Sequence, residues 1–404
     1  MERSAEHATT SEAAAPALTA DQRRRSLAAM AAHTYCVGFT LGLVIPLASL
    51  LLERQGISNT VIGLNTAMPG LAILAIGPFA GRLVPRLGML PAIYGGLALA
   101  AAALALMAAF PTVGAWFALR FFYGAGLALP WVAVETWINS VATDRERSRA
   151  VALYSAALYA GIGSGPLAIE LVGIEGLLPW ALGVAALVLA AVFVALVRGL
   201  APRLMPAPEA RILQVVRFAP VLLGAALLGG FCESATYALF PLYGLEIGLG
   251  QGRAVAGLSV LVVGAIAFQW PLGWLADRMD RRRLLLALAL AAAGTVALLP
   301  AATGAGALLW VLLAVLGGLL LGFYVLGLSA LGARFQGQRL TMANAAFVVA
   351  YTVGEASGPV VVGFAMDLWR PHGFVAGIVG ALLAFALLAA LRFRAAGPET
   401  GQDA

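Results

Sequence analysis

Charged residues are scarce in this chain of 404 residues. Only 11% of the residues are Asp, Glu, Lys or Arg, whereas 62% are hydrophobic and the mean hydropathy is +0.93. A water-soluble domain cannot hide that much apolar surface. The composition therefore excludes a soluble globular protein and leaves no room for a sizeable soluble domain beside membrane-spanning segments.

Lysine is absent, and cysteine and ligand motifs are few. All 25 basic residues are arginines at the ends of apolar runs, so the net charge of +6 indicates membrane topology and no nucleic-acid partner. Cys36 and Cys232 lie in apolar segments, and we expect no disulfide. Without a phosphate loop, metal-ligand cluster or nucleophile triad, we expect no cofactor, no metal, no enzymatic activity and no ATP-driven pumping.

Twelve apolar runs are long enough to cross a bilayer as helices, which predicts an all-α membrane protein. We place the spans near residues 27–52, 59–81, 89–110, 114–138, 149–173, 177–197, 218–246, 253–276, 284–304, 306–332, 340–367 and 373–391.

A stretch rich in proline and charge at 199–217 divides these spans into two six-helix halves, 27–198 and 218–394. We interpret 1–26 as a disordered N-terminal tail and 395–404 as a C-terminal tail. Matching segments at nearly one offset indicate that the halves are duplicates. These pairs are Gly161-x-x-x-Gly165-Pro166 with Gly354-x-x-x-Gly358-Pro359, Gly77-x-x-x-Gly81-Arg82 with Gly273-x-x-x-Asp277-Arg278, and Tyr35-Cys36 with Phe231-Cys232.

The arginines also predict orientation. If both termini and the linker face the cytosol, 21 arginines lie on that side, and only Arg54, Arg253 and Arg370 lie outside. Arg120 falls within a span. This asymmetry predicts a multi-pass protein of a bacterial inner membrane with both termini cytoplasmic.

The motif Gly273-x-x-x-Asp277-Arg278, followed by Arg281 to Arg283, closes the eighth span. It resembles the loop signature of the major facilitator superfamily, and with the repeat, the linker and the helix number the resemblance covers the whole chain. It implies two pseudo-symmetric six-helix bundles that rock around a substrate site at mid-membrane.

This loop has an expected gating role. Gly273 should allow two helices to approach closely, Asp277 should cap the N-terminus of span five, and Arg278 and Arg281 should hold the turn in the cytosol. The alternative is a plain positively charged turn. In the first-half copy Gly81 stands where the acid is expected, beside Arg82.

The segment Gly161-x-x-x-Gly165-Pro166 resembles a signature that the family associates with exporters. Glycines four residues apart give close helix contact, and the proline bends the span. Its recurrence as Gly354-x-x-x-Gly358-Pro359 leaves helix packing alone as the alternative.

Three ionisable residues deep in spans are expected to couple transport to protons. Glu233 and Glu355 both lie about fifteen residues into their spans, near mid-membrane. Two nearby carboxyls away from water cannot both ionise cheaply, so we expect them to share a proton. Arg120 is the expected charge partner. The alternatives are buried hydrogen bonds for the glutamates and a structural ion pair or snorkelling for Arg120.

Other polar and aromatic residues complete the expected site. Glu135 is expected to pair with Arg82 or Arg86 in gating, and His33 is either a proton relay or a packing residue. Residues assigned to the substrate cavity by analogy with the family are His33, Tyr35, Phe39, Trp131, Tyr237 and Tyr324.

We therefore expect a monomeric secondary transporter that exports a small, partly apolar organic molecule in exchange for protons. Proton-coupled uptake of a metabolite is the alternative, since the same carboxyls serve either direction. A transporter-like sensor or a membrane enzyme would need longer loops or an extra domain. The lipid bilayer, protons and a small-molecule substrate are the expected partners.

Overall fold

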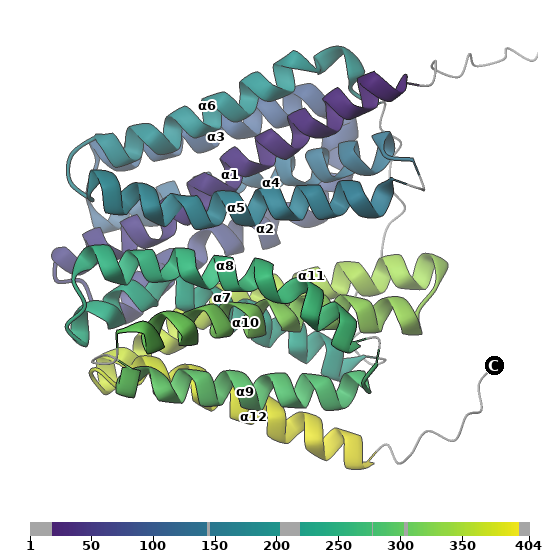
Figure 1. The fold of residues 1–404 in the computed structure, drawn as a ribbon. Helices are drawn as coiled ribbons and strands as arrows, with labels where there is room; N and C mark the ends of the chain where they lie inside the picture. The colour runs from purple at the N-terminus through teal and green to yellow at the C-terminus, as the bar shows by residue number, and fades with distance from the viewer. Residues whose placement is uncertain (1–17, 144–145, 203–218, 277, 303–305, 396–404) are drawn as a thin grey trace, which may run out of the picture.

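The structure, a computed structural model, describes residues 18–143, 146–202, 219–276, 278–302 and 306–395 (Figure 1). Within these ranges, twelve helices are long and apolar enough to cross a membrane, which confirms the predicted spans. The first six are α1 (Ala20–Arg54), α2 (Asn59–Leu87), α3 (Met89–Ala109), α4 (Val113–Val141), α5 (Arg147–Val172) and α6 (Leu178–Leu196). The second six are α7 (Pro220–Glu246), α8 (Gln251–Ala276), α9 (Arg281–Ala302), α10 (Ala307–Arg334), α11 (Gly337–Leu368) and α12 (Gly373–Ala395).

The start of α1 corrects one expectation. The helix begins at Ala20, so residues 20–26 are helical although the sequence suggested a tail. The cause is a capping box: Gln22 N donates to Thr19 Oγ1 at 3.3 Å, and Thr19 N donates to Gln22 Oε1 at 2.9 Å. The tails and linker at 1–17, 203–218 and 396–404 lie outside the described residues.

Figure 1 shows two bundles side by side, α1 to α6 and α7 to α12, which we call the N half and the C half. The first turn of α1 and the last turn of α12 lie at one end of the molecule, together with the arginine-bearing turns between α2 and α3 and between α8 and α9. We call it the arginine-rich end. The turns at 55–58, 173–177, 247–250 and 369–372 lie at the opposite end.

Each half contains one close helix crossing at its repeated glycines. In the N half, a Cβ on Gly165 of α5 would fall on the backbone of Gly42 and Leu43 in α1. In the C half, a Cβ on Gly358 of α11 would fall on the backbone of Phe231 in α7. The predicted close contact is therefore confirmed for both repeats, and each lies inside one half, as helix packing requires.

Two helix pairs make most of the contact between the halves. The α2 and α11 helices meet where a Cβ on Gly63 would fall on the carbonyl group of Pro359. The α5 and α8 helices meet where Ser259 Oγ donates to the Gly163 carbonyl at 2.7 Å. The α5 and α11 helices thus each hold a crossing within their own half and a contact with the other half.

Candidate functional site

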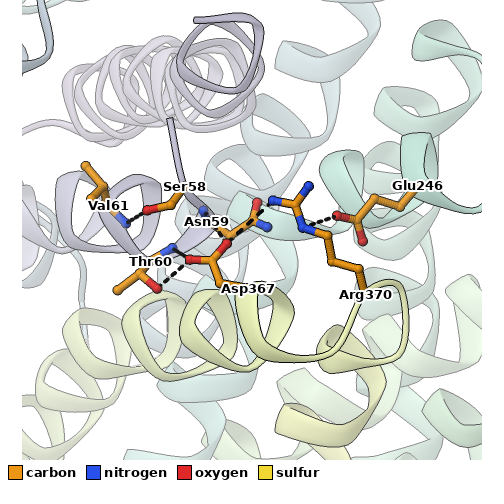
Figure 2. Close-up of polar contacts among 7 residues, drawn as sticks. All are labelled: Ser58, Asn59, Thr60, Val61, Glu246, Asp367 and Arg370. Atoms are coloured by element: carbon orange, nitrogen blue, oxygen red, sulfur yellow. Dashed lines mark hydrogen bonds and ion pairs between the residues drawn. The ribbon is translucent and has the colours of Figure 1, made fainter. Parts of the chain in front are cut away.

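At the opposite end, Asp367 of α11 binds the N-terminus of α2 in the other half (Figure 2). Its Oδ1 accepts from Asn59 N at 2.9 Å, and its Oδ2 accepts from Thr60 N at 2.8 Å and from Thr60 Oγ1 at 2.6 Å. The first N–H groups of a helix lack partners within it and carry partial positive charge, so a carboxylate is stabilised there. We call Asp367 with Asn59 and Thr60 the outer latch.

Neighbouring side chains support the outer latch. Ser58 caps α2 from its own chain segment by accepting from Val61 N at 3.4 Å. Arg370 lies between two acids, with its Nη2 3.6 Å from Asp367 Oδ1 and its Nε 3.5 Å from Glu246 Oε1 (Figure 2). Arg370 is largely exposed, so these ion pairs contribute less than the charged hydrogen bonds.

Near mid-membrane, the structure brings together the two glutamates expected to form a pair. Glu233 of α7 accepts a hydrogen bond from the Tyr351 hydroxyl, and Glu355 interacts electrostatically with Glu233. Close crossing makes this possible, because a Cβ on Gly230 would lie 3.1 Å from Glu355 N. Tyr351 precedes Glu355 by one helical turn, so both face α7.

The other half also contributes to this carboxyl site. Tyr159 of α5 interacts electrostatically with both Glu233 and Glu355. Tyr237, one turn beyond Glu233, lines with it a small hollow between α7, α8 and α10. The pair therefore belongs to the C half but is approached by a tyrosine of the N half. Sequence reasoning missed Tyr159 and Tyr351, although Tyr351 lies four residues before Glu355.

Arg120 lies elsewhere. Its side chain is fully buried, with 1% exposed, and its Nη1 donates to the Val44 carbonyl of α1 at 3.4 Å. Among the described residues its electrostatic neighbour is Tyr123, and neither Glu233 nor Glu355 is one. The structure thus separates Arg120 from the pair it was expected to neutralise, and its contacts fit the structural alternative.

Glu135 of α4 lies beside tyrosines of both halves. It is exposed, and its carboxyl group interacts electrostatically with Tyr154 of α5 and Tyr324 of α10. Tyr324 belongs to the C half, so Glu135 faces the other half. Its expected gating pair with Arg82 or Arg86 stays a prediction.

Aromatic side chains surround these acids. Tyr35 is 40% exposed although it lies in the middle of α1, and its hydroxyl donates to Ser164 Oγ at 3.0 Å. Trp131 is 39% exposed and lines a small hollow between α1, α4 and α5. The Tyr324 and Tyr351 rings meet edge to face with centroids 5.1 Å apart.

We use the name central cavity for the two hollows, one in each half, together with the polar and aromatic side chains beside them. Its N-half members are Tyr35, Trp131, Glu135, Tyr154 and Tyr159. Its C-half members are Glu233, Tyr237, Tyr324, Tyr351 and Glu355. The electrostatic contacts of Tyr159 with Glu233 and of Tyr324 with Glu135 link the two parts.

Two residues assigned to the cavity have mainly packing contacts. His33 is 3% exposed, and its Nδ1 lies 3.3 Å from the Ala190 carbonyl of α6, so it fits the packing alternative while bordering the hollow beside Trp131. Phe39 is half-buried in α1, and its backbone borders the crossing at Gly161.

At the arginine-rich end, a Cβ on Gly273 would have no neighbour within 4 Å among the described residues, so no close approach to another described segment needs this glycine in this conformation. Arg278 lies over the Trp274 ring, 4.0 Å from its centroid. Arg281 begins α9. Asp277 lies outside the described residues, so its contact with span five stays a prediction.

The described residues contain no cluster of three or more His, Cys, Asp or Glu that could hold a metal ion. Instead, the described chain offers two like bundles that meet mainly through α2 with α11 and α5 with α8, and titratable groups of both halves near one another. This is the architecture of a secondary transporter, which moves solutes by rocking one half against the other.

The chain belongs to the Major Facilitator Superfamily, whose family model matches residues 30–325 and 256–404. It is 28% identical over 262 residues to the Bacillus subtilis MFS-type transporter YfkF, covering 63% of this chain and 67% of that protein. It is 30% identical over 288 residues to the Escherichia fergusonii MFS-type transporter YcaD, covering 69% and 72%.

Solved structures share the fold at low sequence identity. The nucleoside transporter NupG is 14% identical with a TM-score of 0.76, covering 92% of this chain and 100% of that one. A D-xylose-proton symporter is 15% identical with a TM-score of 0.72, covering 94% and 99%.

Proposed function

We propose that this transporter is driven by protons, with Glu233 and Glu355 as the proton-binding pair. The observation that supports it is the joint position of the two carboxyls beside Tyr351, with Tyr159 of the other half approaching both. Two carboxyls in a low-dielectric site hold one proton between them more cheaply than none. Movement of the halves would change the contact with Tyr159 and the access of water to the pair.

Export in exchange for protons is the direction we propose, with proton-coupled uptake as the alternative. The exporter-like segment from Gly161 to Pro166 supports export. Its glycines also pack α5 against α1, and the matching glycines pack α11 against α7, so helix packing accounts for much of this pattern. The carboxyl pair serves either direction.

The proton pair can be tested without any substrate by an infrared pH titration of the purified protein in lipid. We expect one carboxyl to stay protonated at neutral pH and to lose its proton as the pH rises. Glu355→Gln should remove this titrating carboxyl band, and Glu170→Gln, an exposed acid on α5, should leave it unchanged. If Glu355 only hydrogen-bonds a neighbouring helix, its variant will lose stability and keep the band, which would contradict the proposal.

We also propose that the arginine-rich end is cytoplasmic in a bacterial inner membrane. Cys36 and Cys232 are buried and free, and can be replaced to give a background without cysteine. In intact cells an impermeant thiol reagent should label Gln55→Cys at the opposite end, and should label Pro206→Cys in the linker only after permeabilisation. The reverse pattern would overturn the orientation, because the positive-inside rule would then be broken.

A further inference from the structure

The charges of the central cavity are of one sign. Glu135, Glu233 and Glu355 all face it, from both halves. Of the described arginines, only Arg120 lies away from helix ends, and its guanidinium is buried against the Val44 carbonyl. A carboxylate in such a site is stabilised by a cation. No arginine in the interior of a described span supplies one to the three acids.

The three acids are divided between two places. Glu233 and Glu355 lie together in the C half, whereas Glu135 lies in the N half beside Tyr154. The proton shared by the pair in the C half therefore does not occupy Glu135, and a cationic ligand beside Glu135 would favour the ionised form of its carboxyl group. Its exposure in the cavity leaves that carboxylate accessible.

Aromatic rings stand next to Glu135. Tyr324 interacts with it from the C half, and the Tyr324 ring meets Phe347 and Tyr351 edge to face at centroid distances of 5.5 and 5.1 Å. Trp131, one turn before Glu135 on α4, is 39% exposed. Aromatic faces attract cations and also cover apolar ligand surface.

We propose that the transported substrate is an organic cation with an aromatic or apolar body, bound by Glu135 as counter-charge and by the rings of Trp131 and Tyr324. This rests on the proposed function in so far as the central cavity is the transport site. Anions are disfavoured by charge, since the three acids carry net negative charge even when Glu233 and Glu355 share one proton. Neutral sugars are disfavoured because they would leave the Glu135 carboxylate without a partner.

The test compares two ions of similar size and shape but opposite charge, tetraphenylphosphonium and tetraphenylborate, by equilibrium binding to the purified protein in lipid nanodiscs. We expect saturable binding of the cation only. Glu135→Gln should weaken it by about 10- to 100-fold and Trp131→Ala by about 3- to 30-fold, because a charge contact and a cation–π contact are lost. Glu135→Asp and Trp131→Phe should retain most of the affinity, and Glu170→Gln should retain all of it.

Equal saturable binding of the anion, or full affinity in a folded Glu135→Gln protein, would overturn the inference. Glu135→Asp and Trp131→Phe keep the test decisive if a variant does not fold, because each preserves the chemistry at issue. The infrared titration of Glu355 uses no ligand. Normal titration without selective cation binding would therefore reject the substrate class alone, whereas selective cation binding without titration would support it and reject proton coupling.

Discussion

Replacing Gly165 with leucine should abolish production of the folded transporter. A Cβ alone would fall on backbone atoms of Phe39, Gly42 and Leu43 in α1, and backbone cannot move aside as a flexible side chain can. Overpacking a close contact costs about 1–3 kcal/mol and occasionally more, and here the whole crossing of α1 and α5 would have to separate. Size-exclusion chromatography and thermal unfolding in detergent measure the outcome.

The duplication supplies a matched variant for this prediction. Gly358→Leu should fail in the same way, because its Cβ would fall on the backbone of Phe231. Gly294→Leu is the control, since an added Cβ there meets nothing within 4 Å in the part of the chain that the structure describes. A monodisperse Gly165→Leu protein with the melting temperature of wild type would show that the two helices do not depend on this contact.

Replacing Asp367 with alanine should open the opposite end. The change removes three hydrogen bonds to a carboxylate and leaves Asn59 N and Thr60 N without partners. A hydrogen bond to a charged group contributes about 1.5–3 kcal/mol, so the loss of even one should raise the open population by about 10- to 100-fold. Spin labels at Gln55 and His372 can measure the distance between the halves by electron paramagnetic resonance.

The control for this variant is an ion pair at the same end. Arg54 and Glu175 pair at 2.7 Å with the Glu175 side chain 82% exposed, so Glu175→Gln should change the distance distribution little. The outer latch would be refuted as a gate by a distance distribution in Asp367→Ala that matches wild type.

Local sequence patterns predicted the helices and their packing glycines. Each span is a run of apolar residues whose backbone N–H and C=O groups must hydrogen-bond within the helix when it lies in lipid. This requirement is local. The glycines of α5 and α11 were recognised as a repeat, because close helix approach requires small residues at the same positions in both halves. The start of α1 was missed, although Thr19 and Gln22 carry a capping signal.

The side-chain partners could not be predicted, because they depend on which helix faces which across the two halves. Glu135 was expected to pair with an arginine, and it faces tyrosines of α5 and α10. Arg120 was expected beside the glutamates, and its burial against α1 depends on the packing of the N half. Asp367 was not singled out from the sequence, because its partner lies about 300 residues away on α2.

One helix carries the proton pair member Glu355, the packing glycine Gly358 and the latch residue Asp367. Glu355 and Asp367 are twelve residues apart, about 18 Å along a helical rod. A shift of α11 that follows protonation of the pair would therefore reach the opposite end directly. Thermodynamic reciprocity then applies if a proton on the pair favours release of α2. A ligand that holds α2 and α11 together must then lower the affinity of the pair for protons by the same factor by which a proton lowers the affinity for that ligand. An antibody fragment against the opposite end would in this way act as an inhibitor whose potency depends on pH.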